Sequence, residues 1–272
     1  MIPEHVANEG LIRLACFLSM FAAMAGWGLL APARAQSIPL KQRWLSNFGL
    51  MFTGAFFSRM IFSVMPVGMA ELGVYKQTGI LNELEWSKAI EFGIAFLALD
   101  LVIYLQHCLF HHLPLLWRLH RVHHADMEFD ASTGIRFHPL EIAISTAIKL
   151  AAVAALGASP WAVLAFEITL NGTALFNHAN GKMPQALDGL LRLFIVTPDM
   201  HRVHHSVLPH ETNSNFGFNF PWWDRLFGTY RAQPEAGQEG MTIGLPEFRE
   251  PADRTWGALM ALPFRGAKAP AN

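Results

Sequence analysis

The chain has 272 residues, of which 52% are hydrophobic and only 15% are charged, and its mean hydropathy is +0.27. This composition excludes an ordinary soluble enzyme and favours an integral membrane protein. A net charge of -1 without any basic run argues against a nucleic-acid partner. The two cysteines, Cys16 and Cys108, are too few for a disulfide framework or a cysteine-based zinc site.

The first apolar run, Leu11 to Ala31, has the ~20-residue length that a membrane-spanning helix needs. A cleaved signal peptide is the alternative, because residues 33–35 have the small-x-small form of a cleavage site. Three basic residues follow the run, namely Arg34, Lys41 and Arg43. Positive charge after a span favours a cytoplasmic position, so we expect an uncleaved anchor.

Two further spans are predicted at Asn47 to Ala70, interrupted only by Arg59, and at Ile90 to Leu105. Asp100 lies inside the third span, at spacings that return it close to the face of the first histidines downstream. Two interpretations stay open for this carboxylate. It either accepts a hydrogen bond from a histidine ring or forms a packing hydrogen bond to another span.

A helical hairpin is predicted next, with apolar stretches at Leu140 to Gly157 and Trp161 to Phe176. His138 stands just before the proline at which the hairpin starts, and we expect it to support the site rather than to bind a metal.

A polar stripe on the second hairpin helix leads to His178, because Glu167 and Asn171 precede it by eleven and seven residues. We expect both to support the site. His178 is either a ninth metal ligand or a capping or core residue.

Beyond the hairpin, Gly181 to Val196 predicts an amphipathic helix along the membrane surface. Thr197-Pro198-Asp199 is a helix-start signal. No repeat is evident, so we expect one membrane-embedded domain over residues 1–272, of which 231–272 form a polar C-terminal tail.

Histidine carries the chemistry. Eight of the 13 histidines fall into one H-x-x-x-H and two H-x-x-H-H patterns, in which residues three and four apart share a helical face. The alternative is that these side chains only satisfy one another or face solvent. Eight imidazoles exceed the four ligands of one tetrahedral zinc, which indicates two metals. The motif histidines are His107, His111, His120, His123, His124, His201, His204 and His205.

The predicted spans bring all the histidine motifs to one side of the membrane, together with several arginines, which indicates the cytoplasmic face. The expected fold is an all-α integral membrane protein with about five membrane-embedded helices, made of three spans and the hairpin. A histidine-rich helical cap on the cytoplasmic side completes it.

Further evidence lies in five segments, QHCLFHHLPLLWRLHRVHH, TGIRFHPLE, FNHANGKMP, TPDMHRVHHS and SNFGFNFPWWDRLFGTY. Together they resemble the fatty acid hydroxylase superfamily, specifically its bacterial sterol desaturase family branch. The resemblance implies a lipid oxygenase of the bacterial inner membrane with two iron ions. It also implies that the eight motif histidines are ligands and that His178 is the extra histidine of the family. Zinc binds such nitrogens at least as strongly as ferrous iron, so we expect purified protein to accept zinc as a substitute. Cys108 departs from the expected arginine.

Breaking an unactivated C–H bond needs a redox metal, and no electron-carrier motif occurs in the chain. We therefore expect an external electron donor of ferredoxin or cytochrome type, with its reductase. Sterol, fatty acyl chain, carotenoid and ether lipid all remain open as substrates, as do hydroxylation and desaturation. The alternatives are a dinuclear metal hydrolase acting on a membrane lipid, which would need only activated water, and a metal transporter.

Overall fold

The computed structural model describes residues 8–84 and 86–266. Residues 1–7, Glu85 and residues 267–272, which include both ends of the predicted domain and the end of its tail, lie outside the described residues. The described part of the chain is helical, with two isolated β-bridges and no strand. This confirms the predicted all-α class.

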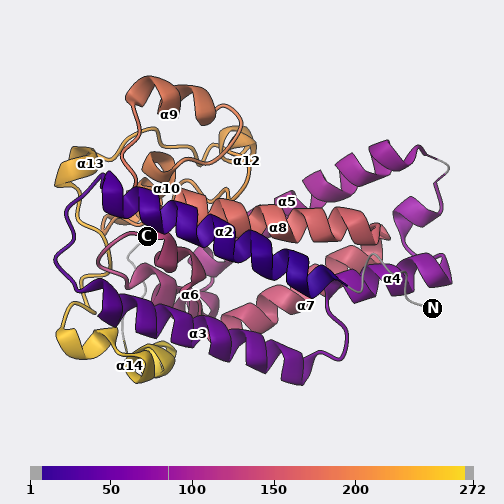
Figure 1. The fold of residues 1–272 in the computed structure, drawn as a ribbon, viewed down its shortest axis with the longest axis horizontal. Coiled ribbons are helices and arrows are strands. Elements are labelled where there is room, and N and C mark those ends of the chain that lie inside the picture. The colour runs from indigo at the N-terminus through magenta and orange to yellow at the C-terminus, as the bar shows by residue number, and fades with distance from the viewer. Residues whose placement is uncertain (1–7, 85, 267–272) are drawn as a thin grey trace.

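Five long helices run side by side along the length of the molecule (Figure 1). Among the described residues, four segments are long and apolar enough to cross a membrane, at Glu9–Leu30, Leu40–Asn82, Lys88–His112 and Pro139–Leu156. The long helices are α2 (Glu9–Leu30), α3 (Leu40–Ile61), α5 (Lys88–His112), α7 (Pro139–Leu156) and α8 (Pro160–Asn177).

The second span differs from its prediction, because the helix is broken inside the expected Asn47–Ala70 run. Helix α3 ends at Ile61, and α4 (Pro66–Lys76) begins after a short connection in which Phe62 and Met65 are extended. Pro66 is the first residue of α4, and the residue before it is extended. Proline has no N–H to continue the helix and disfavours helical geometry at the preceding residue, which explains the break.

The hairpin of α7 and α8 is confirmed, and it turns at Gly157 in the left-handed region (φ 68). A Cβ on Gly157 would lie 2.7 Å from Asn82 Nδ2 and 2.9 Å from the Thr78 carbonyl oxygen. The turn therefore requires glycine, both for its backbone angle and for its close approach to the η1 region (Ile80–Asn82).

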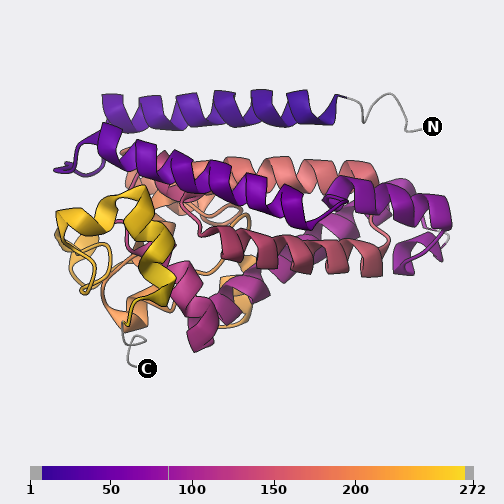
Figure 2. The same ribbon diagram turned by 90° about the horizontal axis from the view of Figure 1, so that it is seen from below.

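Most of the short elements gather at one end of the long helices, whereas α4 lies at the other end (Figures 1 and 2). The predicted amphipathic helix at 181–196 shortens to the seven residues of α9, because Pro184 immediately precedes it and Gly181 forms a β-bridge with Pro32. The short elements at the first of these ends are α6 (Pro114–His124), η2 (Ala131–Ile135), α9 (Gln185–Leu191), α10 (Pro198–His204), α11 (Pro209–Thr212), α12 (Trp222–Leu226), α13 (Gly237–Gly240), η3 (Pro251–Arg254), α14 (Trp256–Ala261) and η4 (Leu262–Phe264).

The C-terminal segment packs on the histidine end of the molecule. Leu245, Phe248, Leu259 and Leu262 are buried in one apolar cluster with Trp117 and other side chains of the helices beneath. The described part of the predicted polar tail therefore contributes apolar side chains to the core.

Helix α2 lies along the outer edge of the bundle (Figure 2), and none of its residues is buried. It is attached through Trp27, whose ring lies 6.2 Å from that of Phe176 and covers Gly181. An ion pair of 2.5 Å joins Arg13 to Glu167 on α8. Apolar side chains such as Leu18 and Leu29 stay exposed, as a membrane requires.

Candidate metal centre

Nine histidines converge at the end of the long helices, and none of their side chains is more than 6% exposed. They form two groups in which the candidate ligand nitrogens lie within 4.8 Å of one another. The five-histidine group comprises His107, His111, His120, His124 and His204. The four-histidine group comprises His123, His178, His201 and His205.

Three helices and the end of a fourth position these histidine rings. Helix α5 supplies two histidines one turn apart, α6 supplies three, and α10 with its C-terminal cap supplies three. Thr197 starts α10 as expected, because its hydroxyl accepts the Met200 N–H at 3.4 Å. His178 is the C-terminal cap of α8 and lies within the four-histidine group. Its predicted role as a ligand therefore has the required position.

The ring nitrogens within each group face one another. In the five-histidine group, the Nε2 atoms of His107 and His120 are 3.1 Å apart. In the four-histidine group, His178 Nε2 lies 3.2 Å from Nε2 of His123, 3.2 Å from that of His205 and 3.1 Å from that of His201.

Backbone carbonyls fix the tautomer of three of these rings. The Nδ1 atoms of His107, His204 and His178 lie 2.7 Å from the carbonyl oxygens of Phe216, Ser214 and Ala174, respectively. A carbonyl only accepts, so each Nδ1 carries the proton and each Nε2 presents its lone pair to the group.

A metal fits this donor set. The buried Nε2 atoms of His111, His124 and His204 have no hydrogen-bond partner in the part of the chain that the structure describes, and His178 Nε2 faces three other nitrogens with a lone pair. Facing lone pairs repel unless a cation lies between them, and imidazole is a good ligand for iron and zinc. Burial also holds the pKa values of His124, His204 and His205 well below the ordinary value, which keeps these rings neutral and able to bind a cation.

Glu141, which the sequence reasoning missed, supports the five-histidine group. Its Oε1 accepts from His120 Nδ1 at 2.6 Å, and both side chains are buried. The sequence signal for it was the start of α7 at Pro139, which fixes Glu141 in the first turn.

A second missed residue, Asp224, shapes the loop that presents the Phe216 carbonyl to His107. Its carboxylate accepts from the N–H groups of Phe216 at 2.8 Å and Gly217 at 2.9 Å. A Cβ on Gly217 would lie 2.8 Å from that carboxylate, so the loop needs glycine there. Asp224 therefore acts on the histidine only through the backbone.

Aromatic rings wall the centre. Phe137 stacks on His123 with ring centroids 4.5 Å apart, and Phe129 stacks on His178 at 5.3 Å. Trp117 lies 5.0 Å from His111. These rings exclude water and strengthen electrostatic interactions inside the site.

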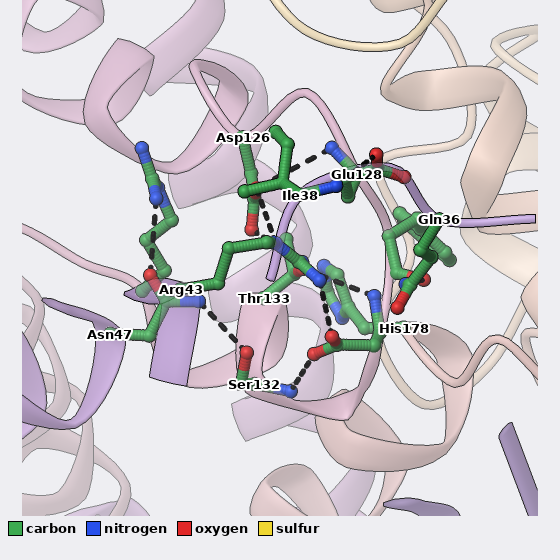
Figure 3. A network of polar contacts seen from close by, with 12 residues as sticks. Gln36, Ile38, Arg43, Asn47, Asp126, Glu128, Ser132, Thr133 and His178 are labelled. Carbon is green, nitrogen blue, oxygen red and sulfur yellow. Dashed lines mark hydrogen bonds and ion pairs between the residues drawn. The ribbon is translucent and has the colours of Figure 1, made fainter. Parts of the chain in front are cut away.

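A buried ionic network braces the loop beside the four-histidine group. Figure 3 shows the guanidinium of Arg43 between Asp126 and Thr133, with His178 beside the same network. Arg43 donates to Asp126 Oδ1 at 3.1 Å, to Asp126 Oδ2 at 2.9 Å and to Thr133 Oγ1 at 3.1 Å, and it also pairs with Asp130. Burial alone would raise the pKa of Asp126, but the neighbouring charges of Arg43 and Arg136 hold it well below its ordinary value.

The other predicted supporting residues do not contact the histidine groups through any hydrogen bond among the described residues. Asp100 accepts from Trp223 Nε1 at 2.8 Å, so its partner is an indole rather than an imidazole. His138 caps α7 by accepting the Leu140 N–H at 3.2 Å.

The predicted polar stripe on α8 likewise points away from the site. Glu167 pairs with Arg13 at 2.5 Å and with Lys149 at 2.7 Å, while Asn171 is exposed. A single helical face is wide enough to meet several neighbouring helices, and the periodic spacing to His178 did not distinguish among them.

The fold and the site define a helical, membrane-embedded protein with a buried histidine-rich centre. The family model for fatty acid hydroxylases matches residues 92–229, and the chain belongs to this family. The predicted membership of its sterol desaturase branch stays a prediction.

Three curated relatives illustrate the similarity. The chain is 32% identical to alkylglycerol monooxygenase of Danio rerio over 61% of this chain and 36% of that protein. It is 30% identical to ornithine lipid hydroxylase OlsE of Rhizobium tropici over 58% of this chain and 47% of that protein. It is 28% identical to cholesterol 25-hydroxylase of Rattus norvegicus over 53% of this chain and 47% of that protein. The match thus covers less than half of each of these relatives. No solved structure matches the chain.

Proposed function

We propose that the protein is a membrane di-iron oxygenase that hydroxylates or desaturates a C–H bond of a lipid. The observation that supports this most is the pair of buried all-histidine groups at one end of an apolar helical bundle. The relatives named above are monooxygenases and hydroxylases whose names specify lipids, which supports a lipid substrate.

The five-histidine group would hold one iron and the four-histidine group the other. Bound iron supplies the activation of dioxygen that C–H oxidation requires and that no side chain provides. The chain's own contribution is to keep the rings neutral, to aim their Nε2 atoms and to exclude water. Zinc binds the same nitrogens at least as strongly as ferrous iron, so purified protein would also accept zinc.

The reaction needs an external electron supply. Hydroxylation consumes dioxygen, two electrons and two protons, and it yields an alcohol and one water. Desaturation consumes the same reactants and yields a double bond and two waters. We assign the electrons to a separate partner of ferredoxin or cytochrome type with its reductase.

We place the protein in the bacterial inner membrane with the site at the cytoplasmic face. The support is the position of the basic residues that follow α2. Arg34 donates to the Met241 carbonyl at 2.8 Å and Arg43 pairs with Asp126, so both lie at the histidine end of the molecule. Positive charge between two spans favours the cytoplasmic side.

The hydrolase alternative has less support. Dinuclear hydrolases usually recruit carboxylates as metal ligands, whereas both candidate groups formed by the buried histidines contain no carboxylate. The two functions separate experimentally, because a hydrolase turns over without oxygen and without reductant.

The test uses the full chain in lipid nanodiscs with ferrous iron, a ferredoxin and its reductase, bacterial lipid extract and isotopically heavy dioxygen. Mass spectrometry should find heavy oxygen in an alcohol product, or a lipid that has lost two hydrogens. His111→Ala should abolish the product, whereas His112→Ala should not, because His112 is exposed on the neighbouring face of α5. Turnover that persists without oxygen and reductant would contradict the proposal.

A further inference from the structure

His120 differs from the other eight histidines in the kind of partner that its outer ring nitrogen, Nδ1, bonds. The Nδ1 atoms of His107, His178 and His204 bond backbone carbonyls, and that of His111 lies 3.3 Å from the side-chain amide oxygen of Asn213. Among the nine histidines, His120 alone pairs with a carboxylate within the described part of the chain. A carboxylate acceptor raises the basicity of a metal-ligating imidazole more than a neutral acceptor does.

The local fold holds Glu141 in place. Pro139 opens α7, and His138 caps it by accepting the Leu140 N–H at 3.2 Å. Glu141 is therefore the third residue of the helix, where the positive end of the helix dipole favours a carboxylate. Its side chain is directed at His120 by a helix that belongs to the membrane bundle, not by a mobile loop.

The second oxygen of Glu141 has no partner among the residues that the structure describes. Its Oε2 is buried without a hydrogen bond, and among the described residues no lysine or arginine forms an ion pair with this carboxylate. A buried carboxylate without a cationic partner is costly, and a metal ion behind His120 would offset that cost. Asp126 and Asp130, which lie beside the four-histidine group, already have a cationic partner in Arg43.

The two metal positions are consequently unequal. The five-histidine group has a ligand supported by a negative charge, whereas no carboxylate among the described residues bonds a ring of the four-histidine group. We infer that Glu141 is a positioning residue that acts through His120 and selectively strengthens metal binding at the five-histidine position. This inference rests on the proposed metal centre.

The test measures metal binding directly, with cobalt(II) as the probe metal and a competing chelator, on the full chain in detergent. Loss of outer support for a ligand typically weakens metal affinity ~10–100-fold. We expect Glu141→Gln to weaken one of two cobalt sites by about 10-fold. Glu141→Leu, which also removes the acceptor, should weaken it further. The visible absorption of cobalt should shift in Glu141→Gln, which a merely structural change would not produce.

Two variants that each lack one histidine show which of the two metal positions Glu141 affects. In His178→Ala the remaining tight metal belongs to the five-histidine group, and adding Glu141→Gln should weaken it. In His204→Ala the remaining tight metal belongs to the four-histidine group, and adding Glu141→Gln should leave its affinity unchanged. Thr146→Val is the matched control, because Thr146 is a buried polar residue of α7 whose hydroxyl donates to the Ile142 carbonyl within its own helix.

Each possible outcome either supports or overturns the inference. Wild-type affinity at both sites in Glu141→Leu, or equal weakening at both sites, would overturn the inference. Binding of fewer than two cobalt ions by the wild-type chain would instead refute the proposed dinuclear centre. If Glu141→Leu does not fold, Glu141→Gln still decides the question, because it keeps the size and the acceptor of the native side chain.

Discussion

Replacing Arg43 by methionine should destabilise the protein strongly. The guanidinium is only 2% exposed and pairs with two buried carboxylates, Asp126 and Asp130. Removal of one partner of a buried ion pair costs ~3–5 kcal/mol, because the remaining charge stays buried and unpaired. Arg136 remains close enough to lower the pKa of Asp126, which argues for the lower end, about 3 kcal/mol.

Thermal unfolding in detergent measures this loss. At ~2–4 °C per kcal/mol for a chain of this size, Tm should fall by roughly 6–12 °C. Arg59→Met, an exposed change on the same helix, should shift Tm far less. Adding Asp126→Asn to Arg43→Met should recover part of the loss, because it removes one unpaired charge. Equal Tm values for Arg43→Met and Arg59→Met would refute the reasoning.

Three further changes have specific expected outcomes. Gly134→Ala should cost ~1–3 kcal/mol in thermal unfolding and release metal, because its Cβ would lie 2.5 Å from the Ala174 carbonyl oxygen that orients His178. Gly189→Ala is the control, because a Cβ there would meet open space, and equal effects of the two changes would contradict the clash. Thr197→Ala should cost about 1 kcal/mol by removing the cap of α10, whereas Thr197→Ser should retain stability, and a Tm unchanged by alanine would exclude the cap. Burial lowers the pKa of His178 to about 4, whereas the pKa in the unfolded chain is ~6.5, so between these two values only the unfolded chain takes up the proton. The metal-free protein should therefore lose stability as the pH falls from ~6.5 toward 4. A Tm that stays constant across this pH range would contradict the expectation.

The spacing of the histidines predicted most of the centre, because helical periodicity places residues three and four apart on one face whatever the surrounding fold. The lengths of the two apolar runs, together with the turn residues between them, predicted the hairpin of α7 and α8. The break before Pro66 was missed because hydropathy continues across it, while the proline interrupts the backbone.

The carboxylates were assigned less well. Asp100 and Glu167 stand at helical spacings from histidines, yet they bond Trp223 and Arg13, respectively. Glu141 has no such spacing and contacts His120, because α6 packs against α7. Which side chain meets a given face is decided by tertiary packing between elements, and a single sequence carries no record of that packing.

No side-chain motif predicts the remaining contacts that orient the histidine rings, and the reason is physical. Backbone carbonyls of Phe216, Ser214 and Ala174 accept the outer N–H of three histidines, and every residue has a carbonyl. What the sequence does encode is the loop conformation that aims such a carbonyl, here through Gly217 and the carboxylate of Asp224. Residues that shape loops near a ligand motif are therefore as informative about a metal centre as polar residues at ligand-like spacing.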